Sequence, residues 1–198
     1  MNSAHFTLYE GDITENGWLN SVFEKEKPAV VVHIAGLTGV SASFQRPYDF
    51  FTNNVTGTLN ILEAAGRHGT GKLVYLSTVS VYGDSVDPAT EDKTPASPVS
   101  PYAASKWMGE ELCRQYAVTG NLQIAVLRLC TVYGPRQRPN MAVAQFVSKA
   151  LGGEKIPVYG DATGIRDYLY IGDCVDGIMK AMAHAASFDI FNIGGNEG

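Results

Sequence analysis

The sequence AVVVHIAG, residues 29–36, is apolar at nearly every position and indicates a β-strand that is covered on both faces. A strand with one solvent-facing side would alternate apolar and polar residues, and this segment does not. We therefore expect it near the centre of a parallel sheet, with His33 as a core residue. Five other short runs rich in apolar and aromatic residues have the length of strands: 6–9, 73–76, 124–129, 156–159 and 190–193.

Two longer segments between these runs carry apolar residues at helical spacing, residues 49–67 and residues 102–116. An alternation of strands with helices predicts βαβ units. The fold class predicted is α/β, a Rossmann-like parallel sheet with helices on both faces. Residues 84–101 contain four prolines and are expected to form a surface loop that leads into the second helix.

The composition is that of one compact globular unit of 198 residues, with 45% hydrophobic and 18% charged residues. The formal net charge of −5 argues against a protein that coats nucleic acid. The start of the chain lacks the pattern of a signal peptide, and the sequence has no apolar run long enough to span a bilayer. Three cysteines without a CxxC pair disfavour a disulfide framework or a zinc site, so we expect a cytoplasmic protein.

A candidate active site is marked by Tyr102 and Lys106, which are four residues apart at the start of the second helix and so share a face. They follow the run 73–76, whose carboxyl end carries the hydroxyl residues Ser77, Thr78 and Ser80. Open α/β sheets bind their ligands at the carboxyl ends of the strands. The sequence therefore predicts that the pair and the hydroxyls line one site.

The chemistry expected of this pair is general acid/base catalysis. A cation about 4 Å from a phenol, at an effective dielectric constant of 20, contributes roughly 4 kcal/mol. We therefore expect Lys106 to lower the pKa of Tyr102 from its usual value near 10 toward about 7, where a general base works best. Cys130, an isolated cysteine at the end of an apolar strand, is interpreted as packing rather than as a reactive thiol.

Several stretches of the chain resemble the extended short-chain dehydrogenase/reductase family, and within it the NAD-dependent nucleotide-sugar epimerases. The order and spacing of the matching stretches extend over essentially the whole chain. They are GDI at 11–13, HIAGLTGV at 33–40, NNVTGTLNILEAA at 53–65, LSTVSVYG at 76–83, SPYAASK at 100–106, RLCTVYGPRQRP at 128–139, IPVYGD at 156–161 and IRDYLYIGD at 165–173.

The resemblance implies NAD as cofactor and a UDP-sugar as substrate. Tyr102 would be the base, Thr78 would bind the sugar hydroxyl, and Lys106 would hold the nicotinamide ribose. The remaining cofactor contacts implied are Asp12 and Ile13 at the adenine, the loop Ile34, Ala35, Gly36, Leu37 and Thr38, and the bordering residues Asn53 and Cys130. The remaining substrate contacts implied are Ser80, Thr131, Arg136 and Arg166, the last as a clamp on the diphosphate.

The sequence departs from the family pattern at its beginning. No GxGxxG or GxxGxxG motif occurs, and Asp12 already corresponds to the family's third strand. The chain is expected to be an interior fragment or a reduced member. We expect residues 1–150 to form a partial NAD-binding domain, and residues 151–198 to begin a small subdomain that binds the nucleotide-sugar.

Alternatives remain open for the reaction and the sugar. Related 4,6-dehydratases carry acidic residues after the catalytic threonine, where this chain has Val79 and Ser80, so 4-epimerisation through a 4-keto intermediate is favoured. The alternative is a non-catalytic fragment that binds a nucleotide-sugar or a partner, because the phosphate loop is missing. The stretches resemble UDP-glucose and UDP-glucuronate 4-epimerases alike. Family members often form homodimers through the helices that here begin near Asn53 and Tyr102.

Overall fold

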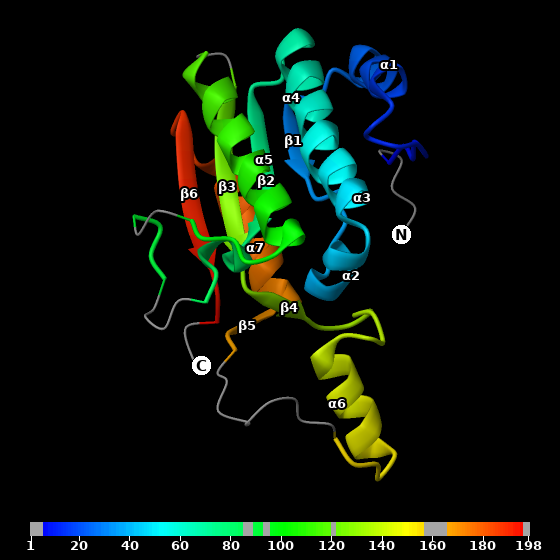
Figure 1. The fold of residues 1–198 in the computed structure, drawn as a ribbon. Coiled ribbons are helices and arrows are strands. Elements are labelled where there is room, and N and C mark those ends of the chain that lie inside the picture. Colours follow the sequence, from blue (N-terminus) through cyan, green and yellow to red (C-terminus); the bar gives the residue numbers. More distant parts are fainter. Residues whose placement is uncertain (1–5, 85–88, 93–95, 120–121, 157–165, 196–198) are drawn as a thin grey trace.

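A computed structural model describes residues 6–84, 89–92, 96–119, 122–156 and 166–195. Its main sheet has four parallel strands in the order β1-β2-β3-β6, and a short parallel pair, β4 and β5, lies beyond the carboxyl ends (Figure 1). The strands are β1 (Val30–His33), β2 (Lys72–Thr78), β3 (Gln123–Leu129), β4 (Thr131–Tyr133), β5 (Tyr168–Tyr170) and β6 (Phe188–Ile193).

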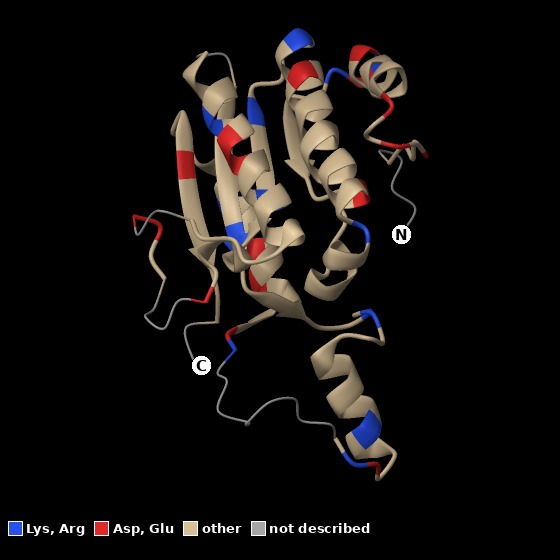
Figure 2. Cartoon of the chain, viewed as in Figure 1, with Lys and Arg blue, Asp and Glu red and all other residues tan. Residues whose placement is uncertain are grey.

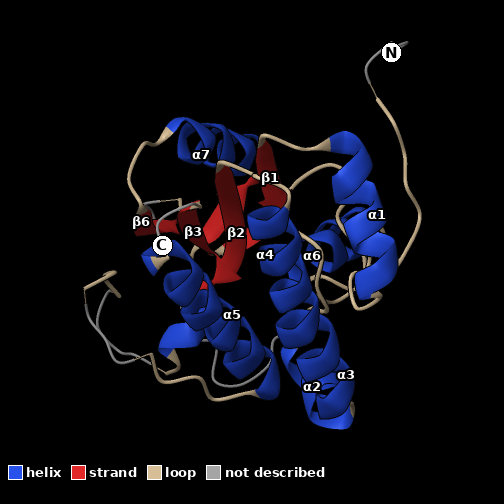
Figure 3. Cartoon of the chain, turned by 90° about the horizontal axis from the view of Figure 1, so that it is seen from above, coloured by secondary structure: helices blue, strands red, loops and turns tan. Residues whose placement is uncertain are grey.

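Helices cover both faces of the main sheet, which confirms the predicted Rossmann-like architecture. Three of them, α1 (Asn16–Glu26), α4 (Gly57–Arg67) and α5 (Pro101–Val118), lie on one face, and α7 (Ile171–Ala183) lies on the other (Figure 3). The core is split in the same way. Side chains of β2 and β3 alternate between a cluster under α4 and α5, which includes Tyr75 and Val126, and a cluster under α7, which includes Val74 and Leu127.

The predicted helix over 49–67 is present but interrupted. Helix α3 (Pro47–Phe51) runs into a π-helical turn, Thr52–Thr56, before α4 begins. A π-helical turn rotates the side chains that follow it relative to α-helical spacing, and such turns are frequent at functional sites. Two further helices complete the described chain: α2 (Val40–Gln45), and α6 (Ala142–Leu151), which extends away from the sheet in Figure 1.

Two of the strand predictions were wrong in part. Residues 6–9 form no strand, and Phe6 is 74% exposed, because a single extended segment is stable only when another strand satisfies its backbone hydrogen bonds. β1 forms as predicted but lies at the edge of the described sheet, where Val30 is 37% exposed, so its expected central place was also wrong. The buried central strands are β2 and β3. Of the predicted run 156–159, residues 157–159 lie outside the described residues.

Parallel pairing in register brings the strand ends to one edge. Thr78, the last residue of β2, pairs with Leu129 of β3, and the chain leaves β1 at the same edge after His33. Lys and Arg lie interspersed with Asp and Glu along the described helices (Figure 2). None of the helices in the described ranges is both long and apolar enough to cross a membrane.

Candidate active site

A cavity of 510 Å³ opens at the carboxyl ends of β1, β2 and β3. Four segments enclose it: the loop after β1, the 3-10 turn Val79–Tyr82 after β2, the first turns of α5, and the segment that follows β3. Its polar lining comes from Thr38, Ser77, Thr78, Ser80, Tyr102, Lys106, Cys130, Thr131, Gln137 and Arg138. The structure therefore brings the predicted tyrosine, lysine and hydroxyl residues to one site.

The start of α5 fixes Tyr102 and Lys106. The Ser100 hydroxyl caps the helix by accepting a hydrogen bond from the Ala103 backbone N–H at 3.2 Å, and Pro101 occupies the first helical position. The ring of buried Phe50 packs edge-on against the Tyr102 ring, with centroids 6.2 Å apart. Helix capping and aromatic packing together hold the phenol over the cavity.

The pKa of Tyr102 differs from the value that the sequence predicted. Burial raises the pKa of Tyr102 above its usual value, and a hydrogen bond with Thr78 and the charge of Arg138 lower it in part. The predicted lowering by Lys106 was wrong, because the Lys106 Nζ lies over the ring of Tyr75, 4.1 Å from its centroid. Burial also lowers the pKa of Lys106 itself, to about 8.

The predicted cofactor loop after β1 is held by a residue that the sequence analysis missed. The Asn54 side chain, buried in the π-helical turn, accepts a hydrogen bond from the Leu37 N–H at 2.7 Å and donates one to the Ser105 hydroxyl at 2.9 Å. A Cβ on Gly36 would stand 3.1 Å from the Asn54 Oδ1, so a glycine allows this close approach. The predicted Asn53 is not part of the cavity lining, and its buried Oδ1 has no hydrogen-bond partner.

Other predicted site residues lie outside the cavity lining. Asp12 accepts hydrogen bonds from both the backbone N–H and the hydroxyl of Thr14, at 2.8 and 2.9 Å. Exposed Arg136 has a φ of 68°, and exposed Arg166 lies two residues before the first residue of β5. Ile13 and Ala35 likewise do not line the cavity.

Arg138 was missed by the sequence analysis, although it is two residues from the predicted Arg136. Its Nη2 donates a hydrogen bond to the Thr38 hydroxyl at 2.8 Å, which joins the segment after β3 to the loop after β1 across the cavity. Two arginines in one irregular segment give no periodicity that would tell which of them faces the site.

Cys130 lines the cavity as a protonated thiol. Its Sγ donates to the Asp167 Oδ2 at 3.3 Å, and burial, with this hydrogen bond, raises the pKa of Cys130 to about 12. A thiol with such a pKa is a poor nucleophile at neutral pH. The observation agrees with the interpretation of Cys130 as an unreactive cysteine.

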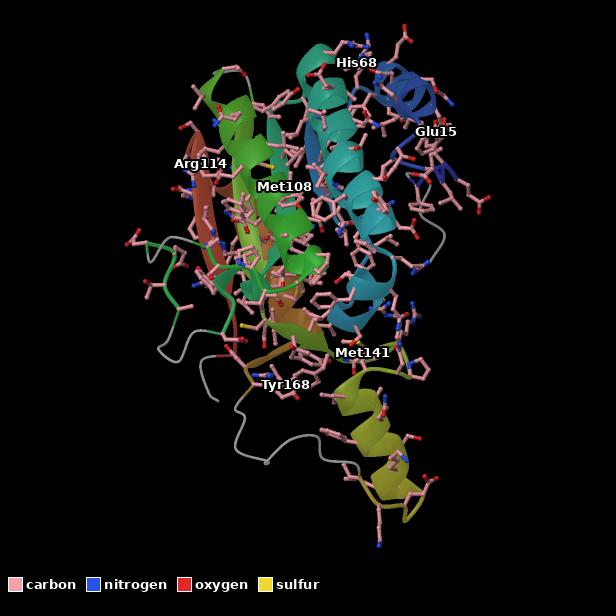
Figure 4. The ribbon with its side chains drawn as sticks, viewed as in Figure 1. Glu15, His68, Met108, Arg114, Met141 and Tyr168 are labelled. Atoms are coloured by element: carbon pink, nitrogen blue, oxygen red, sulfur yellow. The ribbon has the colours of Figure 1, made fainter. Side chains whose placement is uncertain are left out.

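A second hollow lies beside the first, over β4 and β5. It is lined by Tyr133, Tyr168, Tyr170 and Asp173, together with Val143 of α6 and Gly195. The ring of Tyr133 packs edge-on against that of Tyr168, with centroids 6.3 Å apart. Tyr168 and Met141, which lines the main cavity, both lie below the carboxyl ends of the main sheet (Figure 4).

Comparison with known proteins agrees with this geometry. Residues 1–194 match the NAD dependent epimerase/dehydratase family. The chain belongs to this family, which is NAD-dependent. Among curated relatives, a UDP-glucuronate 4-epimerase of Thermodesulfobacterium geofontis is 37% identical over 98% of this chain and 60% of its own length. A human dTDP-D-glucose 4,6-dehydratase is 32% identical over 98% of this chain and 56% of its own.

Solved structures of the family have the same fold. The UDP-glucuronic acid 4-epimerase from Bacillus cereus, in complex with UDP-glucuronic acid and NAD, superposes with a TM-score of 0.89 at 34% identity, over 99% of this chain and 62% of that one. The UDP-glucose 4-epimerase from Thermotoga maritima, with UDP-glucose, gives a TM-score of 0.89 at 33% identity, over 94% of this chain and 62% of that one. The chain thus spans about 60% of the length of the relatives it matches.

The cavity has the chemistry that the nicotinamide end of NAD requires. Ile34, Leu76 and Leu129 supply apolar surface, whereas Lys106 and the backbone of the loop after β1 supply polar groups. Mostly apolar walls with a few placed polar groups are typical of cofactor sites. The residues present therefore fit the reactive end of the cofactor.

Proposed function

We propose that the chain carries the catalytic centre of an NAD-dependent nucleotide-sugar 4-epimerase. The support is the convergence of Tyr102, Thr78 and Lys106 around one cavity, in a chain of the epimerase/dehydratase family. Bound NAD would supply the acceptor for the hydride of the sugar carbon and the donor for its return. Lys106 and the loop Ile34–Thr38 would hold its nicotinamide ribose.

Tyr102 moves the proton. Its phenol takes the proton of the sugar 4-hydroxyl while that carbon is oxidised, and it returns the proton when the 4-keto sugar has turned and is reduced on its other face. Thr78 already makes a hydrogen bond with this phenol, so its hydroxyl can orient the sugar oxygen. The Arg138 charge lowers the pKa of Tyr102 against the effect of burial and so favours the basic form.

Epimerisation is favoured over dehydration by the lining of the cavity. Among the described residues that line it, none is Asp or Glu. Elimination of water needs a further acid and base besides the tyrosine. Val79 and Ser80, which follow Thr78, supply neither.

UDP-glucuronate is the substrate that the polar groups favour. The Arg138 guanidinium lines the cavity, and the hydroxyls of Ser80 and Thr131 line it as well. A guanidinium and hydroxyl groups form charge-assisted hydrogen bonds with a carboxylate, which UDP-glucose lacks. The curated relative from T. geofontis named above is a UDP-glucuronate 4-epimerase.

The test is interconversion of UDP-glucuronate and UDP-galacturonate by this chain with NAD, followed by NMR, with UDP-glucose as the competing substrate. Tyr102→Phe should lower turnover by about two to four orders of magnitude, because the ring stays packed but the proton is lost. Tyr116→Phe is the matched control, since that phenol lies on the same helix but is bonded to Glu63 and is absent from the cavity lining.

Equal rates for Tyr102→Phe and the wild type would refute the assignment of the base. Binding of UDP-glucuronate in calorimetry with no turnover by the wild-type chain would instead support the non-catalytic alternative. A preference for UDP-glucose would agree with the proposed mechanism but contradict the assignment of UDP-glucuronate as the substrate.

A further inference from the structure

A buried ion pair lies directly behind the cavity. Glu110 of α5 and Arg128 of β3 have side chains that are 1% and 2% exposed. The Arg128 Nη2 donates to the Glu110 Oε2 at 2.6 Å, and the Arg128 Nε lies 3.1 Å from each carboxylate oxygen. This is the two-pronged geometry in which arginine binds carboxylates most specifically.

Each member of the pair is next to a residue of the cavity. The Ser77 hydroxyl donates to the Glu110 Oε1, and Ser77 directly precedes Thr78 on β2. Glu110 is one helical turn after Lys106 on the same face of α5. Arg128 is two residues before Cys130. The pair therefore joins three elements of the cavity: β2, which carries the hydroxyl of Thr78, α5, which carries Lys106, and β3, which leads to the far wall.

A second set of contacts holds Arg128 from the other side. Its Nη1 donates to the Tyr82 hydroxyl at 2.8 Å, and its guanidinium lies 4.7 Å from the centroid of the Tyr82 ring. The Tyr82 hydroxyl in turn donates to the Asn192 Oδ1 of β6 at 2.8 Å. Tyr82 ends the 3-10 turn that carries Ser80, so this turn is tied to the same pair.

Stability alone does not account for such a pair. Removing two charges from water costs free energy, and apolar residues of similar size in place of a buried ion pair are often equally or more stable. What apolar residues cannot supply is directional bonding to Ser77 and Tyr82. Resting on the proposed function, we propose that Glu110 and Arg128 are positioning residues that hold Thr78, Ser80 and Lys106 in the geometry needed for epimerisation.

The charge of Glu110 also reaches Lys106. Burial lowers the pKa of Lys106, and the carboxylate of Glu110 and the thiol of Cys113 act in the opposite direction. The other groups that face the ammonium are the ring of Tyr75 and the imidazole of His33. Glu110 thus favours the charged lysine, which the proposed ribose contact uses.

The first experiment follows the titration of Lys106 by the NMR shifts of its Cε and Nζ, with no substrate or cofactor present. Glu110→Gln keeps the shape of the side chain and removes its charge, so the midpoint should fall below that of the wild type. Glu111→Gln is the matched control: it removes the same charge from the next position of α5, where the side chain is 46% exposed and pairs with Arg114. This control should leave the midpoint unchanged.

The second experiment separates positioning from folding. The double variant Glu110→Met/Arg128→Met removes both charges without stranding either, and should remain folded by circular dichroism even if Glu110→Gln does not. We expect kcat for UDP-glucuronate to fall by about 10- to 100-fold, with a much smaller change in KM, because catalytic groups are displaced by fractions of an ångström.

An unchanged Lys106 midpoint in folded Glu110→Gln, or wild-type kcat in the double variant, would overturn the inference. If the wild-type chain shows no turnover, the proposed function fails. The Lys106 titration then still decides whether Glu110 acts on the lysine.

Discussion

Asn54 binds both backbone groups of Leu37: its Oδ1 accepts from the Leu37 N–H at 2.7 Å, and its Nδ2 donates to the Leu37 carbonyl at 3.0 Å. The same Nδ2 donates to the hydroxyl of Ser105, the residue before Lys106. One buried amide therefore joins the loop after β1 to the helix that carries the tyrosine and the lysine. The distance between the proposed cofactor loop and the proposed base is set by this side chain.

Asn54→Ala should accordingly lower the free energy of unfolding by about 1–3 kcal/mol, because it leaves the part-buried backbone N–H and carbonyl of Leu37 without their side-chain partner. Neighbouring Asn53→Ala serves as the control, since the Asn53 Oδ1 is buried without a hydrogen-bond partner and its removal should cost less. Urea denaturation measures both. Equal losses would show that the contacts of Asn54 add little to the fold.

The sequence predicted the parts of the fold that depend on local pattern. β2 and β3 each contain a continuous apolar run, residues 73–76 and 124–127, and burial of those runs on both faces follows from the pattern whatever their neighbours. Whether a strand is central or at an edge depends on which segments pair with it, and the apolar run of β1 carries no such information. The short pair β4 and β5 was missed because three-residue strands are too short to show a period.

The candidate site was predictable where spacing on a regular element decides geometry, as for Tyr102 and Lys106. It was not predictable at Asn54, because the π-helical turn shifts side-chain directions without a sequence signal. The pKa of Tyr102 was predicted from its pairing with Lys106 alone, whereas in the structure burial raises this pKa and the charge of Arg138 lowers it. Long-range packing decided each of these points.

Lys106→Met should abolish turnover and yet stabilise the folded chain at pH 7. The pKa of Lys106 is lowered from 10.5 to about 8, chiefly by burial, so the unfolded chain binds this proton more tightly and the buried charge destabilises the fold below pH 8. Loss of the contact with the Tyr75 ring offsets part of the gain, which leaves about 1–2 kcal/mol.

The advantage of Lys106→Met should shrink as the pH rises from 8 to 10.5, because the wild-type lysine loses its proton over that range in the folded chain. Lys149→Met is the control, since that ammonium is partly exposed and pairs with Glu154 at 3.2 Å. Urea denaturation at pH 7 and pH 10 measures the difference. A variant that is less stable than the wild type at pH 7 contradicts the prediction.

Arg138→Ala should reduce turnover of UDP-glucuronate by about tenfold or more, since a hydrogen bond to a charged group contributes roughly 1.5–3 kcal/mol. Turnover of UDP-glucose should fall less. The Arg138 charge lowers the pKa of Tyr102, which acts as the base, so its loss should also move the acidic limb of the pH–rate profile to higher pH. Arg136→Ala distinguishes the two arginines, and a larger effect there would assign the sugar contact to Arg136 instead.

We expect His33 to lower the stability of the fold in acid. Burial, with a smaller contribution from the Lys106 charge, lowers the pKa of His33 from 6.5 to about 3. The folded chain therefore keeps this imidazole neutral, hydrogen-bonded to the Thr58 hydroxyl at 2.9 Å, whereas the unfolded chain binds a proton below pH 6.5. Between pH 6.5 and pH 3 the unfolded state holds the extra proton, so the free energy of unfolding falls as the pH falls. One such proton contributes about 1.4 kcal/mol for each pH unit, or about 2–3 kcal/mol between pH 6.5 and pH 4.5.

His33→Gln keeps a polar group for Thr58 but cannot titrate, so its stability should depend less steeply on pH by that amount. Urea denaturation of both chains at several pH values measures the two slopes, and acidic residues that titrate in both chains cancel in the difference. Parallel slopes would mean that His33 is protonated in the folded chain, and a ring shift that titrates near pH 6.5 in the NMR spectrum would confirm that reading independently.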